Sequence, residues 1–315
     1  RSWHLQSVGS TDDGNSATET SSARRFPGLR SAGGILDRIV EKKAGRLLYA
    51  RFSGSKTGVA KSPDPEISQN PNPARSNSRL SFAGAVGRRD RINVIAEIKR
   101  QSPSKGVIRQ DFDPVAIAES YSRNGAAALS ILTEEDFFGG SLAYLTQIRE
   151  KVPDIPLLRK DFIFDECQIR ESKEAGADAL LLITAILGDE LLSRLISATR
   201  DAGLEPLVEV HTAGEMERAL RAGAHTIGVN NRDLTDFTVN LGTSIELARL
   251  APAGKLLVSE SGIKTGGDIA LLRQAGFSAF LIGEHLMRQH DPGECLAGLV
   301  DAAGSGALLS QTEPY

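Results

Sequence analysis

Two short apolar segments end in a pair of charged or titratable residues that stand two positions apart. One segment ends with Glu97 and Lys99, and the other ends with Glu209 and His211. In a β-strand, residues two apart point to the same face. Each pair would therefore lie within ion-pairing reach, and each member would shift the pKa of the other. Such pairs suit general acid–base catalysis, although a buried structural ion pair is an equally good interpretation of either pair taken alone.

The same change from apolar to polar character occurs at the end of eight apolar segments. In chain order, the segments end in Glu97-Ile98-Lys99, Thr133-Glu134-Glu135, Arg159-Lys160-Asp161, Thr184, Glu209-Val210-His211, Asn230-Asn231-Arg232, Glu260-Ser261-Gly262 and Gly283-Glu284. If the segments are parallel strands of one barrel, these ends meet at one rim. Burying so many charges together is costly unless they serve a function. The sequence therefore predicts an active site at the carboxyl ends of the strands.

Glycines and basic residues at these ends indicate an anionic substrate. Gly262 and Gly283 would let backbone N–H groups approach a phosphate, although helix ends and tight turns use glycine too. The loop over residues 100–106 is short, polar and basic, and it could close over a substrate or simply be solvated. A substrate with a phosphate and a carboxylate carries about three negative charges. The cations available at the strand ends are Lys99, Lys105, Lys160 and Arg232.

Short apolar runs alternate with segments of helical periodicity over most of the chain. The runs are about four to seven residues long, as expected for strands buried on both faces. They begin near Val94, Ala127, Ile155, Ala179, Pro206, Thr226, Leu256 and Ala279. Helical periodicity is found over 113–123, 189–201 and 244–250. Five of the helical segments end at a glycine that can form a left-handed turn, namely Gly125, Gly176, Gly203, Gly223 and Gly276.

This alternation can close into a (β/α)₈ TIM barrel or form an open doubly wound sheet. Roughly 210 residues are involved, which is typical of a compact barrel. No G-x-G-x-x-G follows the first strand, which weakens the case for a dinucleotide-binding sheet. We predict the barrel with an extra N-terminal helix. The predicted divisions are a flexible extension (1–33), a helix over 34–50 and a polar linker over 53–79 (together 34–92), the barrel (93–303) and a C-terminal tail (304–315).

Composition narrows the classes of partner and cofactor. The 315 residues carry a formal net charge of −3, which gives no reason to expect nucleic acid or a membrane surface as partner. No apolar run approaches the roughly 20 residues of a membrane span. Cys167 and Cys295 make no disulfide framework and fit a reduced, cytoplasmic protein. The five histidines show no metal-ligand spacing, so no metal is expected.

Six segments, taken together and in order, resemble the motifs of one enzyme family. They are EIKRQSPSKG over 97–106, SILTE over 130–134 with Phe138 and Gly140, LRKDFI over 158–163, LVEVH over 207–211, GVNNRDL over 228–234 and SESGI over 259–263. Through them the chain resembles the indole-3-glycerol-phosphate synthases over roughly residues 93–300. Residues 34–50 also resemble the family's extra N-terminal helix, and residues 80–86 resemble the short helix before its first strand.

The resemblance implies a decarboxylating, dehydrating ring closure in tryptophan biosynthesis. The substrate would be 1-(2-carboxyphenylamino)-1-deoxyribulose 5-phosphate, and the products indole-3-glycerol phosphate, carbon dioxide and water. The aryl carbon attacks a ketone, which needs a general acid, for which we expect Lys160. Loss of carbon dioxide and of a hydroxyl needs an acid and a base in turn. Glu209 and Lys99 suit these roles, with Glu97 setting the charge state of Lys99.

The resemblance also implies the remaining site residues. Asn230 and Glu260 would orient substrate hydroxyls and the lysines. Substrate or phosphate binding would fall to Ser102, Phe138, Arg232, Ser261, Gly262, Gly283 and the backbone N–H of Glu284. No cofactor is implied, because the aniline nitrogen supplies the electrons. The protein would be a monomer or a weak homo-oligomer acting on a small phosphorylated substrate.

Two other functions fit parts of the pattern. Another phosphate-binding barrel, such as phosphoribosylanthranilate isomerase, needs one acid–base pair but not two lysines and a further glutamate. A barrel that has lost catalysis and only binds a ligand needs none of them. Lys99, Lys160 and Glu209 are all present, which favours the synthase over both alternatives.

Overall fold

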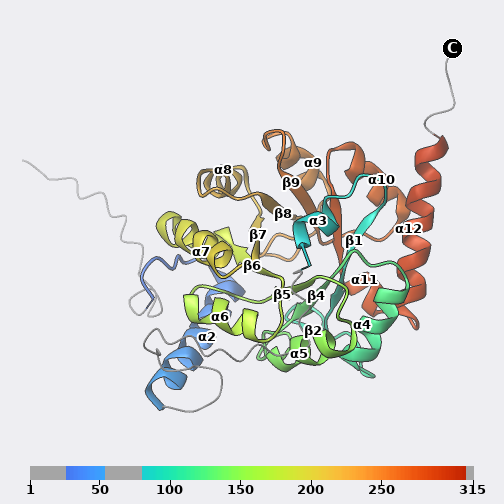
Figure 1. Cartoon of the computed structure of the whole chain (residues 1–315). Coiled ribbons are helices and arrows are strands. Elements are labelled where there is room, and N and C mark those ends of the chain that lie inside the picture. Colours follow the sequence, from blue (N-terminus) through green and yellow to red (C-terminus); the bar gives the residue numbers. More distant parts are fainter. Residues whose placement is uncertain (1–25, 54–79, 310–315) are drawn as a thin grey trace, which may run out of the picture.

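The computed structural model describes residues 26–53 and 80–309 and contains a closed barrel of eight parallel strands (Figure 1). Each barrel strand pairs with the next along the chain, and the last pairs with the first. The barrel strands are β1 (Asn93–Ile98), β4 (Ala128–Leu132), β5 (Leu157–Lys160), β6 (Ala179–Ile183), β7 (Glu205–Val210), β8 (Thr226–Asn230), β9 (Leu256–Glu260) and β10 (Ala279–Ile282). The predicted (β/α)₈ barrel is confirmed.

Helices form an outer layer around the barrel (Figure 1). They are α4 (Pro114–Arg123), α5 (Leu142–Lys151), α6 (Glu166–Glu174), α7 (Asp189–Asp201), α8 (Ala213–Arg221), α9 (Gly242–Ala248), α10 (Gly266–Gln274), α11 (Glu284–Met287) and α12 (Pro292–Leu309). A short hairpin, β2 (Gln101–Ser102) and β3 (Gly106–Val107), lies in the loop after β1, and a 3₁₀ turn (Thr184–Ile186) follows β6.

Local sequence signals fix where these helices start and stop. At the start of α4, the Asp113 side chain accepts hydrogen bonds from the N–H groups of Val115 and Ala116, and Pro114 occupies the first turn. These are features that favour a helix N-terminus. The five predicted stop glycines all adopt φ between 74° and 101°. That left-handed conformation ends the helix at little steric cost, and the chain then enters the next strand.

The strands are apolar because both of their faces are covered. Every residue of β1, β4, β6, β8 and β10 is buried. One face packs inside the barrel and the other packs under the helices, which is the reason the strands read as continuous apolar runs rather than as alternating ones. Polar residues interrupt this pattern mainly toward the carboxyl ends of the strands, where the barrel opens.

The predicted N-terminal helix is α2 (Gly34–Ser53), which packs on the barrel through an apolar face, with Leu36, Ile39, Val40 and Leu47 buried. The predicted boundary of the flexible extension at residue 33 is wrong. Residues 26–33 are packed, since Phe26 and Leu29 are buried, and Phe26 makes an edge-on contact with Phe164 at 5.1 Å between ring centroids. Two isolated apolar residues in a polar segment give no periodic signal, so the sequence alone did not reveal this contact.

Two other predicted boundaries can be compared with the structure. The short helix α3 (Phe82–Val86) precedes β1, and its first N–H groups bind the Glu205 carboxylate. The barrel does not end at residue 303, because α12 continues to Leu309. Residues 1–25, most of the predicted linker (54–79) and residues 310–315 lie outside the described part of the chain.

Among the described helices, none is both long and apolar enough to cross a membrane.

Candidate active site

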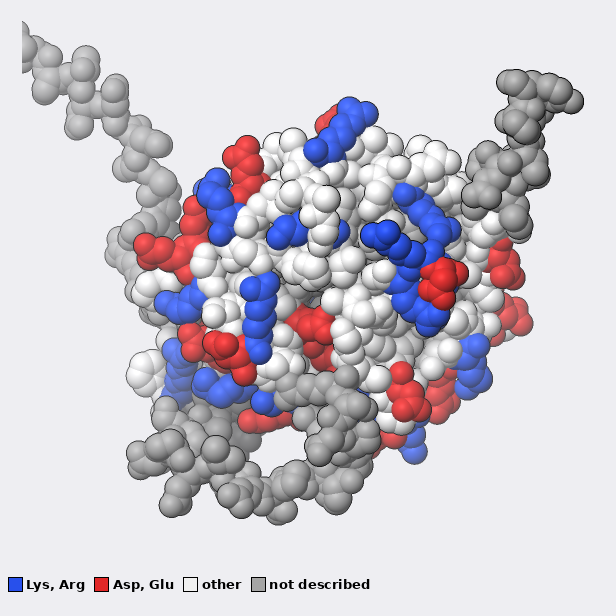
Figure 2. All heavy atoms as spheres, turned by 45° about the horizontal axis from the view of Figure 1, so that its top comes forward, with Lys and Arg blue, Asp and Glu red and all other residues white. Residues whose placement is uncertain are grey.

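Two hollows of similar size differ in their chemistry. One, of about 480 Å³, is lined by basic side chains including Arg89, Arg91 and Lys255. Such basic side chains gather right of centre in Figure 2. The other, of about 570 Å³, contains both carboxylates and cations. Acid–base catalysis needs proton donors and acceptors close together. This hollow brings lysines and glutamates from several strand ends together, so it is the candidate active site.

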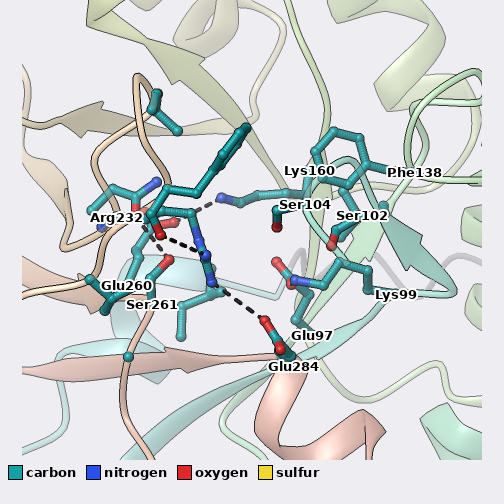
Figure 3. A pocket seen from close by; sticks show the side chains of 18 of the residues that line it. Glu97, Lys99, Ser102, Ser104, Phe138, Lys160, Arg232, Glu260, Ser261 and Glu284 are labelled. Atoms are coloured by element: carbon teal, nitrogen blue, oxygen red, sulfur yellow. Dashed lines mark hydrogen bonds and ion pairs between the residues drawn. The ribbon is translucent and has the colours of Figure 1, made fainter. Parts of the chain in front are cut away.

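This cavity opens at the carboxyl ends of the strands and gathers the predicted site residues (Figure 3). All thirteen line it: Glu97, Lys99, Ser102, Phe138, Lys160, Glu209, Asn230, Arg232, Glu260, Ser261, Gly262, Gly283 and Glu284. They come from both halves of the sequence, and the closed barrel is what brings them together. Their positions follow from strand register; their chemical roles do not.

Lys160, at the end of β5, lies between two buried carboxylates. Its Nζ is 3.1 Å from Glu209 Oε2 and 2.8 Å from Glu260 Oε2. Burial alone would lower the pKa of Lys160, but the charges of Glu260, Glu209 and Glu97 outweigh it and raise that pKa. Lys160 is therefore an ammonium group at every physiological pH.

The two carboxylates that share Lys160 are not equivalent. Burial raises the pKa of Glu260 to about 7 despite the attraction of Lys160, and the nearby charge of Glu209 adds to the rise. Burial also disfavours ionised Glu209, yet Lys160 and then His211 outweigh it and lower the pKa of Glu209. Near neutral pH, Glu209 is thus the ionised member of the pair, and Glu260 is the member able to gain or lose a proton.

Lys99, directly after β1, pairs with a carboxylate of that strand. Lys99 Nζ lies 2.5 Å from Glu97 Oε1, as the two-residue spacing predicted. Burial opposes ionisation of Glu97, but Lys99 and Lys160 outweigh it and lower its pKa. The cavity therefore holds two lysines, Lys99 and Lys160, against three carboxylates, Glu97, Glu209 and Glu260. The charges are nearly balanced, which makes their burial tolerable.

Glycines make room for two of these carboxylates. A Cβ atom at Gly228 would overlap a carboxylate oxygen of Glu260, and one at Gly283 would overlap a carboxylate oxygen of Glu97. The interpretation of Gly283 as a phosphate-binding glycine therefore explains only part of its role. Gly228 was not singled out from the sequence, because its only signal is a glycine inside an apolar strand, which can mark close approach of another group.

One side of the cavity is basic and rich in backbone turns. Arg232 lies 3.4 Å from Glu284, which also pairs with Arg288 at 3.1 Å. Ser261 and Gly262 both have positive φ, 66° and 85°. Arg288 and Lys264 also line the cavity. The sequence analysis missed these two cations because they stand beyond the strand ends, within the helical segment and the loop that follow.

Helix α2 forms an apolar wall of the cavity and is attached to the rim by ion pairs. Ile35, Leu36 and Ile39 line the cavity. On the same helix, Lys43 Nζ lies 2.5 Å from Asp161 Oδ1. Further pairs join α2 to the loops after β4 and β5: Lys42 with Asp136, Arg46 with Glu135 and Asp136, and Arg51 with Asp165. Basic residues of the helix thus face acidic residues of the rim.

Comparison with known proteins decides the family. The family model for indole-3-glycerol phosphate synthase matches residues 54–299. An indole-3-glycerol phosphate synthase of Desulfotalea psychrophila is 45% identical over 267 residues, which cover 84% of this chain and 98% of that protein. One of Chlorobium phaeobacteroides is 53% identical over 211 residues, covering 67% and 81%.

The chain belongs to the indole-3-glycerol phosphate synthase family. This confirms the family predicted from the six motifs, and with it an enzyme of the decarboxylating lyase class in tryptophan biosynthesis. The match also decides against the isomerase alternative. A solved structure of 3-hexulose-6-phosphate synthase from Salmonella typhimurium is similar with a TM-score of 0.56 and 15% identity, covering 68% of this chain and 99% of that one. At that identity, the similarity concerns the fold alone.

Within the residues that the structure describes, no group of three or more His, Cys, Asp or Glu side chains is arranged to hold a metal ion. Lysine and arginine side chains line the cavity and can stabilise negative charge on a bound molecule. Two lysines of the cavity are mostly buried, with side chains 16% (Lys99) and 13% (Lys160) exposed. Electrostatic interactions are stronger in such a setting than in water.

Proposed function

We propose that this cavity closes the indole ring of 1-(2-carboxyphenylamino)-1-deoxyribulose 5-phosphate, with Lys160 as the general acid of the first step. The observation that carries the proposal is the meeting of two lysines, Lys99 and Lys160, with three buried carboxylates in one cavity. A barrel that only bound a phosphorylated ligand would need cations for the phosphate. It would not need a second set of charges deep in the barrel.

The substrate phosphate is proposed to bind at the basic side of the cavity. Arg232 supplies the fixed cation there, and Gly262 and Gly283 supply backbone that can approach closely. With the phosphate held at β9 and β10, the reacting ketone lies over the barrel centre. The aromatic ring then meets the apolar surface that Phe138 and the α2 residues Leu36 and Ile39 offer.

In the first step, the aryl carbon that carries the carboxylate forms a bond to the ketone carbon. The electron pair of the C=O bond moves to oxygen, which takes a proton from the Lys160 ammonium. The high pKa of Lys160 does not prevent this, because a developing alkoxide is a stronger base than an amine. The aniline nitrogen donates electron density to the ring, so the intermediate is a ring-closed cation.

Two losses then restore aromaticity. Carbon dioxide leaves, and the bonding electrons return to the ring and nitrogen cation. The new hydroxyl leaves as water once an acid protonates it, and a base removes the remaining proton to give the indole. Lys99 and Glu209 are the proposed acid and base of this second stage, with Glu97 setting the charge of Lys99. Asn230 and Glu260 orient the reacting groups.

Fluorescence detection of indole formation from the carboxyphenylamino substrate tests the proposal directly. We expect turnover by the purified chain without added metal or cofactor. Absence of indole together with isomerisation of phosphoribosylanthranilate would contradict it. Inorganic phosphate should compete with substrate, and crystals soaked in phosphate should show an anion beside Gly262 and Gly283. An anion bound elsewhere on the rim, with none at that position, would contradict the proposed orientation.

We further propose that the enzyme acts in the cytoplasm as a monomer or a weak homo-oligomer, without a nucleic-acid or membrane partner. Both cysteines, Cys167 and Cys295, are free, which suits a reducing compartment. All thirteen predicted site residues meet in one cavity of a single chain, which supports a site that each copy completes by itself. Light scattering over a range of concentrations tests the assembly state; a dimer that persists on dilution would contradict it.

A further inference from the structure

His211 stands behind the proposed base rather than in the cavity. It follows β7, two residues after Glu209, and its side chain is 12% exposed. Glu209 lines the cavity, whereas His211 is not among the residues that line it. On its outer side, His211 Nδ1 lies 3.1 Å from Glu215 Oε2 of α8, and the same oxygen accepts the backbone N–H of His211 at 2.7 Å. Glu215 therefore holds the ring and keeps a proton on Nδ1.

The inner nitrogen of His211 is directed at Glu209. His211 Nε2 lies 3.4 Å from Glu209 Oε1, is buried, and has no hydrogen-bond partner. The other oxygen of Glu209, Oε2, binds Lys160. One carboxylate thus lies between two nitrogen groups, the Lys160 ammonium on the cavity side and the His211 ring on the outer side.

The groups that surround His211 are almost all acidic. Glu209 (β7), Glu215 (α8), Glu260 (β9) and Asp233, in the loop after β8, interact with its charge. Lys160 binds two of these carboxylates, Glu209 and Glu260, and is shared between them. Burial lowers the pKa of His211, but the bond to Glu215 and the charge of Glu209 outweigh it, so that the pKa is raised.

We propose that His211 is a positioning residue for ring closure, whose imidazolium keeps Glu209 ionised and aligned from the side away from the substrate. The shared proton of the Glu209–Glu260 pair then stays on Glu260, and Glu209 stays free to act as the base. This inference rests on the role proposed above for Glu209. A histidine that only filled space would leave the charge of Glu209 unchanged.

The pH dependence of kcat separates the two roles. In His211→Gln, an amide can still bind Glu215 and Glu209 but carries no charge. Loss of a nearby cation should raise the pKa of Glu209 by about one unit and move the acidic limb of the kcat profile to higher pH by the same amount. The ratio of wild-type to variant kcat should be largest at acidic pH. It should approach one at high pH, where wild-type His211 is itself neutral. A kcat reduced by the same factor at every pH, or an unchanged profile, would overturn the proposal.

A matched control and a second variant separate an effect of His211 on Glu209 from a general effect of replacing a histidine. His225 precedes β8 at the opposite end of the barrel and is exposed, so His225→Gln should keep the wild-type profile. Glu215→Gln retains His211 but removes its anionic partner, and should lower the pKa of His211. That pKa can be followed by NMR even if His211→Gln folds poorly, and it should also fall in Glu209→Gln. An unchanged His211 pKa in both variants would overturn the coupling.

The same set of variants distinguishes the two proposals. If Glu209→Gln keeps its kcat, the role proposed for Glu209 fails. If Glu209→Gln loses activity while His211→Gln behaves as wild type at all pH values, the role of Glu209 stands and the inference about His211 is wrong.

Discussion

Three consecutive residues at the end of β5 belong to two different groups of buried charges. Lys160 pairs with Glu209 and Glu260 inside the barrel mouth. Its neighbours Arg159 and Asp161 pair with each other instead; Asp161 borders the cavity, and Arg159 reaches α6. Both groups are buried next to each other in the same strand end, so the difference between them cannot be attributed to depth or to local fold.

The outer group is fully hydrogen-bonded. Asp161 accepts from Lys43, Thr133 and Arg159, and also from the N–H of Phe162. The Arg159 guanidinium donates in addition to the Gln168 carbonyl and the Ser172 hydroxyl. In the inner group, by contrast, Glu260 Oε1 and His211 Nε2 are buried without a hydrogen-bond partner. Such unsatisfied atoms are costly in a merely structural cluster.

The comparison shows that burial of charge does not by itself separate the two groups, whereas unpaired polar atoms occur in the inner group and not in the outer one. The outer cluster fixes the end of β5 and the attachment of α2. In the inner cluster, the cavity-lining residue Glu260 keeps one carboxylate oxygen without a protein partner. Variants in each group test whether the outer group supports stability and the inner group supports catalysis.

Lys160→Met should give the largest effect and should be confined to catalysis. Methionine keeps the length of the side chain and removes both the proton and the charge. General acid catalysis contributes about 10²–10⁴-fold, so kcat should fall by at least about 10²-fold. Competition by inorganic phosphate should change little, because the anchor lies at Arg232. A near-normal kcat with only a raised KM would show that Lys160 binds substrate, and Lys99 would then be the better candidate for the acid.

Asp161→Asn should have its main effect on stability. The substitution removes the anionic partner of Lys43 and one of the two partners of Arg159, which also pairs with Glu171. Breaking a buried ion pair in this way costs about 3–5 kcal/mol. Denaturant unfolding measures the loss. If stability is unchanged while kcat falls as far as in Lys160→Met, the division between structural and reacting charges is wrong.

The pH dependence of this stability has a definite sign. Burial opposes ionisation of Asp161, but Lys43, then Arg159, outweigh it and lower its pKa to about 2, against about 3.9 for an unfolded chain. A carboxyl with a lowered pKa contributes stability that is present above the unfolded value and lost as pH falls through the folded value. The difference in unfolding free energy between wild type and Asp161→Asn should therefore shrink between about pH 4 and pH 2.

Lys43→Met should have a smaller effect, and it should change both the stability of the protein and substrate binding. Its ion pair with Asp161 is mostly buried, and hydrogen bonds to charged groups contribute about 1.5–3 kcal/mol. Because α2 carries Leu36 and Ile39 into the cavity wall, KM should rise while kcat is nearly kept. Lys42→Met is the matched control, since the Lys42 side chain is 58% exposed and such changes stay within about 0.5 kcal/mol. Equal effects from both variants would contradict a specific role for Lys43.

Much of the fold could be predicted from the sequence because its signals are local. Continuous apolar runs and stop glycines such as Gly203 depend on nearest neighbours, and the closed barrel follows from their eightfold repetition. The site followed from the rule that strand ends converge, together with the two-residue spacing of Glu97 and Lys99. The packing of Phe26 and Leu29 onto the barrel could not be predicted, because it depends on contacts with residues more than a hundred positions away.

The same limit explains what was missed in the site. The Lys43–Asp161 pair joins residues 118 positions apart, and no local pattern connects them. The steric role of Gly228 beside Glu260 likewise depends on the register between β8 and β9. Strand alternation predicted that Glu209 and His211 share a face. It could not tell which of them faces the cavity and which lies behind.

Glu284→Gln should give the smallest effect and tests the basic side of the cavity. Glu284 is a carboxylate beside a proposed phosphate site, and it pairs with Arg232 and Arg288 while 26% exposed. Partly exposed pairs of this kind are worth about 0.2–1 kcal/mol, or about 1.4- to 5-fold in affinity. Removing the negative charge should leave both arginines free for phosphate, so KM should fall within that range, with kcat unchanged. The gain should shrink at high salt, because screening weakens the interactions between exposed charges.

The matched control is Asp90→Asn, which breaks the Arg88 pair in the other basic hollow and should leave KM unaltered. A raised KM in Glu284→Gln would mean that Glu284 holds Arg232 in place, and Glu284 would then belong with the structural charges around Asp161.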